Sequence, residues 1–298
     1  MKNKTLRPVE WPTVWLAAGC YLTWAVAIFG VANWSLAAAM LLTILAAALH
    51  SSLTHEVIHG HPFRNKTLNA ALVWPPLTLF IPYARFRDSH LAHHRDARLT
   101  DPYDDPESNY LDGGDWDRLT ALTRAVRRFN NTLAGRLLIG PLLGQVAWMK
   151  GDWAAIRAGD RAVLLGWIWH LPAMVTVLAL VGVSAMPVWA YLICAYAALS
   201  ILKIRTFLEH QAHERSRCRT VIIEDRGVLA FLFLNNNFHA VHHMHPRLAW
   251  YKLPKLYFAQ PARFLGRNGG YRFATYGEVF RRYLFNAKDP VAHPLWRR

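Results

Sequence analysis

Twelve of the fifteen histidines in the chain lie in, or directly beside, four short groups. The first group is H-E-V-I-H, from His55 to His59, and the second is H-L-A-H-H, from His90 to His94. The third is H-Q-A-H, from His210 to His213, and the fourth is H-A-V-H-H, from His239 to His243. Imidazole nitrogen binds first-row transition metals, so this clustering predicts a metal site.

The spacing within the groups suits helices that present several rings on one side. Positions i, i+3 and i+4 of an α-helix share a face, and both H-x-x-H-H groups have this spacing. Three residues of a rare type at a fixed spacing seldom occur by chance, and the chain has two such matches. Eight or nine clustered imidazoles exceed what one ion coordinates. We therefore expect a centre with two metal ions.

Two other functions use similar residues. The first group fits the H-E-x-x-H pattern of zinc proteases, in which Glu56 would be the general base, but such a protease needs three protein ligands and leaves both H-x-x-H-H groups unexplained. A membrane metal transporter would place polar residues within its spans. The apolar segments contain chiefly His50 and His170, which we expect to be core histidines with satisfied hydrogen bonds.

The composition indicates a membrane protein. Hydrophobic residues make up 53% of the chain, and it contains 13 tryptophans. Lys and Arg outnumber Asp and Glu by 34 to 19, a net charge of +15 that suits an anionic membrane surface, and no nucleic-acid-binding motif accompanies it. The three cysteines have no paired spacing, which argues against a disulfide framework and a thiolate zinc site.

Four apolar segments are long enough to cross a bilayer, at about residues 12–30, 36–53, 163–181 and 188–204. Each is close to the roughly 20 residues that a helix needs to span the hydrocarbon core. They form two pairs, so we expect an all-α integral membrane protein with four transmembrane helices in two hairpins. A cytosolic helical cap would carry the histidines, and the whole chain, 1–298, would be one membrane-embedded domain.

The distribution of charge predicts the orientation. The short connections within each pair contain no Lys or Arg, whereas the termini and the middle of the chain are basic. The positive-inside rule places both termini, residues 54–162 and residues 205–298 in the cytosol, or on the cytosolic side of the inner membrane if the protein is bacterial. All four histidine groups fall on this side.

Three cytosolic features carry further expectations. Residues 115–138 look amphipathic, with a basic face that suits anionic headgroups or water. The acidic loop from Asp101 to Glu107 is expected to be solvated turn structure. His293, in the basic C-terminal tail, is expected at the surface.

With these motifs in place, the chain resembles the membrane fatty acid desaturase and hydroxylase superfamily. The matching text is HEVIH, HLAHH, RTFLEH at the end of the fourth apolar segment, and NNNFHAVHHMHP, and it extends from about Leu36 to Pro246. The resemblance implies that the histidines hold two irons at the cytosolic ends of long helices. It also implies that an acyl chain enters a tunnel among the spans.

The resemblance also assigns roles to individual residues. The H-E-V-I-H, H-L-A-H-H and H-A-V-H-H motifs correspond to the three histidine boxes of this family. Their eight histidines become metal ligands, and a ninth ligand follows the last span: His55, His59, His90, His93, His94, His239, His242, His243 and His210. His213, three residues beyond His210, is an alternative or assisting residue. Glu56, Glu209 and Asn237 are candidates to orient ligand imidazoles, although the asparagines at 235–237 also suit a helix cap.

The resemblance further implies the reaction. Zinc has no redox chemistry, so oxidation of an unactivated C–H bond by O2 calls for iron. We expect desaturation of a lipid acyl chain. Because H-E-x-x-H is nearer to the alkane hydroxylase form of the first box, hydroxylation of an acyl, alkane or carotenoid-type substrate stays open.

The sequence also predicts an electron donor and a candidate binding site for the substrate headgroup. The sequence contains no heme-binding module, ferredoxin cysteine set or nucleotide-binding glycine loop. Electrons must therefore come from a separate donor of the ferredoxin, rubredoxin or cytochrome type. Arg85 and Arg87, just before the second box, are candidates to bind a substrate headgroup, with snorkelling at the membrane interface as the alternative.

Overall fold

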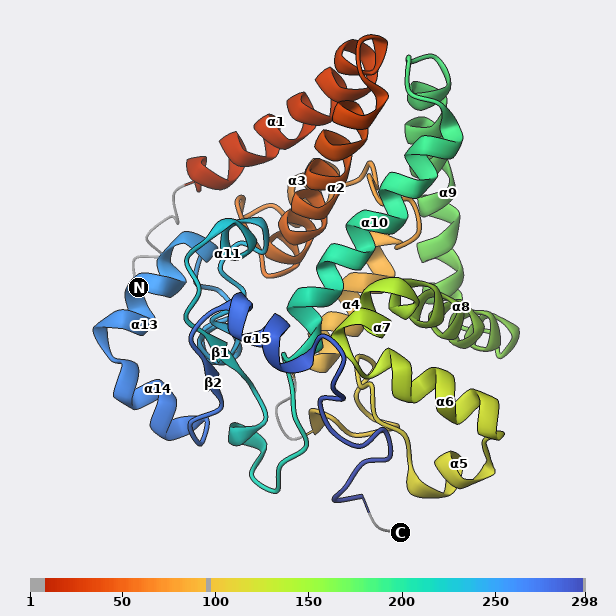
Figure 1. The fold of residues 1–298 in the computed structure, drawn as a ribbon. Helices are drawn as coiled ribbons and strands as arrows, with labels where there is room; N and C mark the ends of the chain where they lie inside the picture. Colours follow the sequence, from red (N-terminus) through yellow and green to blue (C-terminus); the bar gives the residue numbers. More distant parts are fainter. Residues whose placement is uncertain (1–8, 95–97, 297–298) are drawn as a thin grey trace, which may run out of the picture. The chain divides into compact units, whose positions relative to one another are not determined.

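The computed structural model describes residues 9–94 and 98–296, and these residues are mostly helical. They form two compact units. Unit 1 comprises the described residues of 1–84 together with 165–198, and unit 2 comprises those of 85–164 together with 199–298. Each unit is described separately below, and the elements are labelled in Figure 1.

Four helices have the length and composition to cross a membrane. The first is Trp11–Asn33, in which α1 (Trp11–Ala25) continues through a π-helical turn and a 3₁₀ turn. The others are α2 (Leu36–Ile58), α9 (Arg161–Gly182) and α10 (Val188–Phe207). Each predicted span lies within one of these helices, so the prediction of four apolar helices is confirmed. Every helix extends beyond the apolar run from which it was predicted, because the end of an apolar run does not mark the end of a helix.

Unit 1 is held together by apolar packing and a few buried hydrogen bonds. α1 packs against α2, and the Trp24 indole donates to the Tyr191 hydroxyl at 3.2 Å. His50 lies 2.9 Å from the Tyr21 hydroxyl, and His170 lies 2.7 Å from the carbonyl oxygen of Leu79. Both histidines are buried and hydrogen-bonded, which confirms the expectation that they are core residues.

The described residues of unit 2 form mainly short helices, the longer helix α8 and one pair of parallel strands. The predicted amphipathic segment 115–138 forms three helices, α5 (Gly113–Arg118), α6 (Ala121–Asn130) and α7 (Leu133–Leu138). Thr120 and Thr132 cap the second and third of these by accepting from backbone N–H groups, so the chain restarts a helix at each threonine. The remaining helices are α4 (Tyr83–His93), α8 (Gly140–Arg157), α11 (Val228–Leu232), α12 (His239–Met244), α13 (Leu253–Ala259), α14 (Pro261–Arg267) and α15 (Tyr276–Tyr283).

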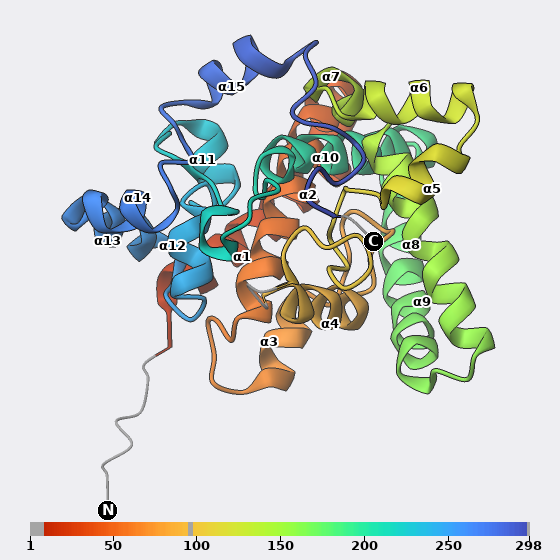
Figure 2. The same cartoon turned by 90° about the horizontal axis from the view of Figure 1, so that it is seen from below.

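A small apolar core in unit 2 fixes the orientation of α12. Strand β1 (Ile222–Ile223) pairs with β2 (Arg272–Phe273), and α13 and α14 follow one another beside α12 (Figure 2). Ala240 and Val241 of α12 are buried in a cluster with Phe238 and Tyr257. Because these two residues face the core, the three histidines of α12 point to another side of the helix.

Candidate metal centre

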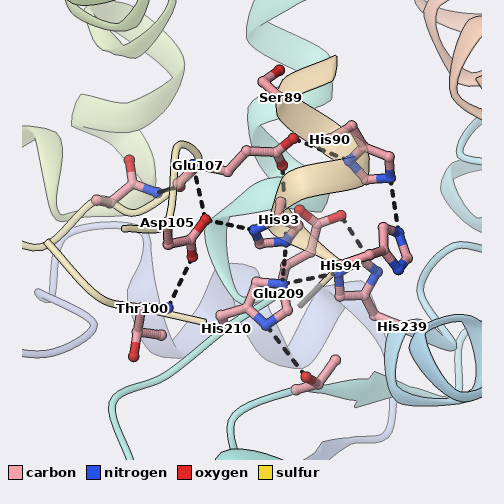
Figure 3. A network of polar contacts seen from close by, with 12 residues as sticks. Ser89, His90, His93, His94, Thr100, Asp105, Glu107, Glu209, His210 and His239 are labelled. Atoms are coloured by element: carbon pink, nitrogen blue, oxygen red, sulfur yellow. Dashed lines mark hydrogen bonds and ion pairs between the residues drawn. The ribbon is translucent and has the colours of Figure 1, made fainter. Parts of the chain in front are cut away.

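The first metal-binding group lies wholly within unit 2. His93, His210, His239 and His243 each offer a ring nitrogen, and these nitrogens lie within 4.8 Å of one another. The Nε2 atom of His210 is 2.9 Å from Nε2 of His93 and 3.2 Å from Nε2 of His239. Figure 3 shows the rings of His93, His210 and His239 turned toward one another. Residues more than 100 positions apart in the sequence therefore converge on one point.

A second group lies in the same unit. His90, His94 and His242 also offer ring nitrogens within 4.8 Å of one another. Nε2 of His94 is 3.0 Å from Nε2 of His90 and 3.2 Å from Nε2 of His242. Each H-x-x-H-H box contributes to both groups, because its i and i+4 histidines enter one group and its i+3 histidine enters the other.

Short helices and their ends bring these side chains together. α4 carries His90 and His93, and His94 follows its last residue. α12 carries His239, His242 and His243. His210 follows the end of α10 in an extended segment that pairs with Thr220. Each histidine of the two groups therefore lies in a helix or shortly after the end of one.

The outward ring nitrogens are held by hydrogen-bond acceptors. Nδ1 of His93 lies 2.7 Å from the carboxylate of Asp105, and Nδ1 of His90 lies 3.0 Å from that of Glu107 (Figure 3). Nδ1 of His239 lies 3.1 Å from the amide oxygen of Asn236. A carboxylate or amide oxygen only accepts, so each ring, when neutral, carries its proton on Nδ1 and directs the lone pair of Nε2 toward the group.

This arrangement fits metal ions. Several lone pairs directed at one point repel each other unless a cation lies among them. Two nitrogens at about 2.1 Å from one ion, with roughly 90° to 110° between them, lie about 3.0–3.4 Å apart. The Nε2 separations in both groups are close to this range. An outer acceptor on the second ring nitrogen is also the common arrangement for metal-ligating histidines.

Electrostatics in the first group favour neutral rings except at one position. Burial and the neighbouring imidazoles hold the pKa values of His210 and His239 well below the ordinary value. Burial also lowers the pKa of His93, but the carboxylates of Glu107 and Asp105 outweigh it and raise the pKa to about 9. In return, His93 and His90 hold the pKa of Glu107 well below its usual range, although burial opposes this. The two carboxylates therefore bring anionic charge to a centre that would hold cations.

His55 and His59 lie in unit 1, at the end of α2. Their ring centroids are 5.0 Å apart, as expected for residues one helical turn apart. Glu56, between them, belongs to another cluster in which its carboxylate, that of Glu10 and a ring nitrogen of His61 lie within 4.8 Å. His61 bridges these acids, at 2.7 Å from Glu10 and 3.9 Å from Glu56.

Two other candidates for orienting the ligand imidazoles, Glu209 and Asn237, have different surroundings. Glu209 accepts from Asn236, the residue that holds His239, and pairs with Arg205. Asn237 instead donates to the backbone carbonyl oxygens of Ile223 and Asp225. The amide that contacts a histidine is therefore the one at position 236, one residue earlier than expected.

The remaining candidates lie outside both groups. The ring of His213 accepts from the backbone N–H of Arg215 and belongs to neither group. Arg85 donates from Nε and Nη2 to both carboxylate oxygens of Asp152, at 2.8–3.1 Å. Arg87 pairs with the adjacent Asp88, and its side chain is exposed.

The acidic loop contains the partners that sequence reasoning missed. The expectation of a solvated turn is wrong for Asp105, which is buried and also accepts from the backbone N–H groups of Thr100 and Glu107. His293 is likewise buried, 3.2 Å from the Thr100 hydroxyl, rather than exposed. The available signal was the presence of acidic residues shortly after a histidine box.

Comparison with known proteins agrees with this geometry. The sequence profile of the family described as "Fatty acid desaturase" matches residues 11–275. A beta-carotene ketolase from Paracoccus sp. (strain N81106 / MBIC 01143) is 27% identical over 256 residues, which cover 80% of this chain and 86% of the ketolase. The profile covers most of the chain, including every histidine group. The chain therefore belongs to the fatty acid desaturase family, and it is a membrane oxidoreductase.

Proposed function

We propose that the chain is an iron enzyme that uses O2 to oxidise a C–H bond of a membrane lipid. The observation that carries the proposal is the convergence of Nε2 atoms in two groups, with Nδ1 atoms held by Asp105, Glu107 and Asn236. All the proposed ligands are imidazoles, which suit iron, and zinc cannot supply redox chemistry. Membership of the desaturase family supports the same metal.

We assign His55 and His59 to the second ion. The first group already has four imidazoles, whereas the second has three within unit 2. His55 and His59 are adjacent on one helical turn and form the first box of the family motif. With them, nine histidines serve two ions.

Iron held by these histidines would supply, together with O2 and two electrons, the oxidising chemistry that removes hydrogen from the substrate. The protein's contribution is to place one methylene group next to the centre and to exclude water. In desaturation, two hydrogens leave the substrate, and O2, two electrons and two protons complete two waters. In oxygenation, one oxygen atom enters a C–H bond and the other becomes water.

Desaturation of an acyl lipid is the first candidate. Oxygenation, including that of a carotenoid-type substrate, is the second, and the similarity to a protein named beta-carotene ketolase favours it. Arg85, one of the two arginines considered for binding an acidic headgroup, is already paired with Asp152. Substrates without such a headgroup are consistent with this pairing.

We also propose that the spans form two hairpins with both termini and the histidines on the cytosolic side. The connections at residues 34–35 and 183–187 contain no Lys or Arg, whereas 54–162 and 205–298 are rich in both. The positive-inside rule places those basic regions in the cytosol, where reduced electron carriers are available.

The proposed electron donor is a separate acidic carrier of the ferredoxin, rubredoxin or cytochrome type. A small surface pocket in unit 2 is lined by His243, Arg217 and Arg267. Both arginines are exposed, so an acidic partner docked there would lie next to one ligand of the first group. Replacing both with Glu should lower turnover driven by such a carrier and leave the iron content unchanged. Equal turnover in the two proteins would place the donor elsewhere.

Product analysis tests the proposed reaction. Lipid extracts of cells that express the wild type, His242→Ala or His245→Ala would be compared by mass spectrometry, and iron would be measured on each purified protein. Desaturation gives a product lighter by two hydrogens, and hydroxylation gives one heavier by one oxygen. His242→Ala should give neither product, whereas His245→Ala, which lies outside both groups, should retain activity. The same product from His242→Ala would reject the proposed site.

A further inference from the structure

Helix α8 carries an apolar stripe on its exposed side. Leu142, Val146, Met149 and Trp153 are between 42% and 63% exposed. Their spacing of four, three and four residues places them on one face of the helix. Soluble surfaces seldom present contiguous large apolar side chains of this kind without a partner.

The rest of the exposed side of α8 is also poor in charge. Gly144, Ala147, Gly151 and Ala154 are exposed small residues on another side of the helix, about 100° or more around its axis from the stripe. Lys150 interrupts the exposed side, and Arg157 ends the helix. A helix surrounded by water normally has charged residues opposite its buried face. The stripe itself therefore suits an apolar environment bordered by polar groups.

The chain connection places α8 at the membrane. Only residues 158–160 separate Arg157 from α9, which is one of the four candidate spans (Figure 1). Asp160 accepts from the N–H groups of Ala162 and Val163 and so begins α9 directly after the connection. Three extended residues reach about 10 Å, so the end of α8 stays close to the membrane surface where α9 enters.

We infer that α8 lies in the plane of the membrane interface, with its apolar stripe against the lipid acyl chains. Arg157 and Arg161, on either side of the connection, lie where lipid phosphates are found and would bind anionic headgroups. Lys150, beside the stripe, can extend its ammonium group to the same layer. The inference depends on α9 crossing a bilayer and is independent of the chemistry at the histidines.

The interfacial position of α8 has a consequence for the metal centre. Asp152 of α8 is buried and binds Arg85 through a two-pronged ion pair. Arg85 lies in α4, five residues before His90, within the helix that supplies histidines to both groups. An interfacial position of α8 would therefore act on α4 through this ion pair.

Spin-label accessibility tests the inference. Cysteine would be introduced singly at 142, 146, 149 and 153, in a chain whose three buried cysteines are replaced by alanine. The labelled proteins would be reconstituted in vesicles of phosphatidylcholine and phosphatidylglycerol. Collision of the label with O2 reports lipid, and collision with a water-soluble nickel chelate reports water. Val175→Cys in α9 serves as the lipid reference, and Arg281→Cys in α15 as the water reference, since both positions are exposed.

The stripe positions should match Val175, with higher accessibility to O2 than to nickel. Labels at Gly144 and Ala147 should be more accessible to nickel, so that the ratio varies with helical period. Nickel accessibility at all four stripe positions would show that α8 lies in water and would overturn the inference. Low accessibility to both reagents would also overturn it, because protein, such as a second copy of the chain, would then cover the stripe.

Discussion

At the scale of single residues, the two H-x-x-H-H boxes divide their histidines in the same way. In the box on α4, His93 enters the first group, and His90 and His94 enter the second. In the box on α12, His239 and His243 enter the first group, and His242 enters the second. The box spacing predicts that three rings share a helical face, and this much can be seen in the sequence. The division of the histidines between the two groups depends on how α4 and α12 approach each other, and helical periodicity does not contain this information.

The residues that bind the Nδ1 atoms of the histidines could not be predicted from the sequence either. Asp105 and Glu107 reach the histidines through an irregular loop, and no periodic pattern reports the path of such a loop. Asn236, rather than Asn237, contacts His239 because the backbone turns sharply at Leu234 and Asn235, both of which have positive φ. Local backbone geometry of this kind decides which side chain in a run of three points at the site.

Asp105→Asn tests the role of the loop. The substitution keeps the shape of the side chain but removes the charge that holds the Nδ1 proton of His93. Loss of such an outer partner typically costs about 10–100-fold in metal affinity, and we expect a decrease of that size. Iron binding would be measured by competition with a chelator. Asp104→Asn, at the exposed neighbouring position, is the control, and equal weakening by both substitutions would contradict the assignment.

The two histidines after α10 should differ in their effect on the metal. His210 lies in the first group, whereas His213 accepts a backbone hydrogen bond outside it. His210→Ala should lower the iron content to about half or less, because the first ion loses one of its four imidazole ligands. His213→Ala should keep wild-type iron, as measured by elemental analysis. The opposite result would move the ninth ligand to His213.

At the scale of elements, the long helices were the most predictable part of the molecule. Runs of apolar residues about 20 positions long predicted the positions of all four. The cap was less predictable. The segment 115–138 has a continuous amphipathic pattern, yet the threonines at 120 and 132 divide it into three helices by capping new N-termini. His293 is buried because the C-terminal tail passes Thr100, a long-range contact that local sequence does not specify.

Asp152→Asn should loosen the attachment of α4 to α8. The buried carboxylate accepts charged hydrogen bonds from Arg85, and its neutralisation leaves a guanidinium without its counter-charge. We expect the free energy of unfolding to fall by about 2 kcal/mol. Thermal unfolding in detergent would measure it, with Asp88→Asn, at the exposed pair with Arg87, as the comparison. A negligible change would show that the pair does not hold the two helices together.

At the scale of the whole molecule, distant segments must fold before the centre exists. The seven histidines that form the two groups in unit 2 come from α4 and the residue after it, from the chain after α10 and from α12. The unfolded chain offers no such preformed site, so binding of the proposed metal ions would contribute to the free energy of folding. Composition and charge predicted a membrane protein with a basic surface, but they could not predict this assembly.

Removal of the metal should therefore destabilise the protein. A ligand present at about 100 times its Kd stabilises the native state by about 2.7 kcal/mol, which corresponds to a Tm shift of about 5 °C for a chain of this size. Treatment with a chelator should lower Tm by at least this amount, and added ferrous iron should restore it. Unchanged Tm values after complete removal of iron would show that the histidines assemble without the ions.

The most direct test of the account is the metal stoichiometry of the purified, membrane-extracted protein. Iron and zinc would be measured by elemental analysis against protein concentration from amino-acid analysis, and the oxidised sample would be examined by Mössbauer spectroscopy. The two histidine groups predict two irons per chain that are magnetically coupled. A single ion per chain, or zinc in place of iron, would contradict the proposal of a dinuclear oxidase.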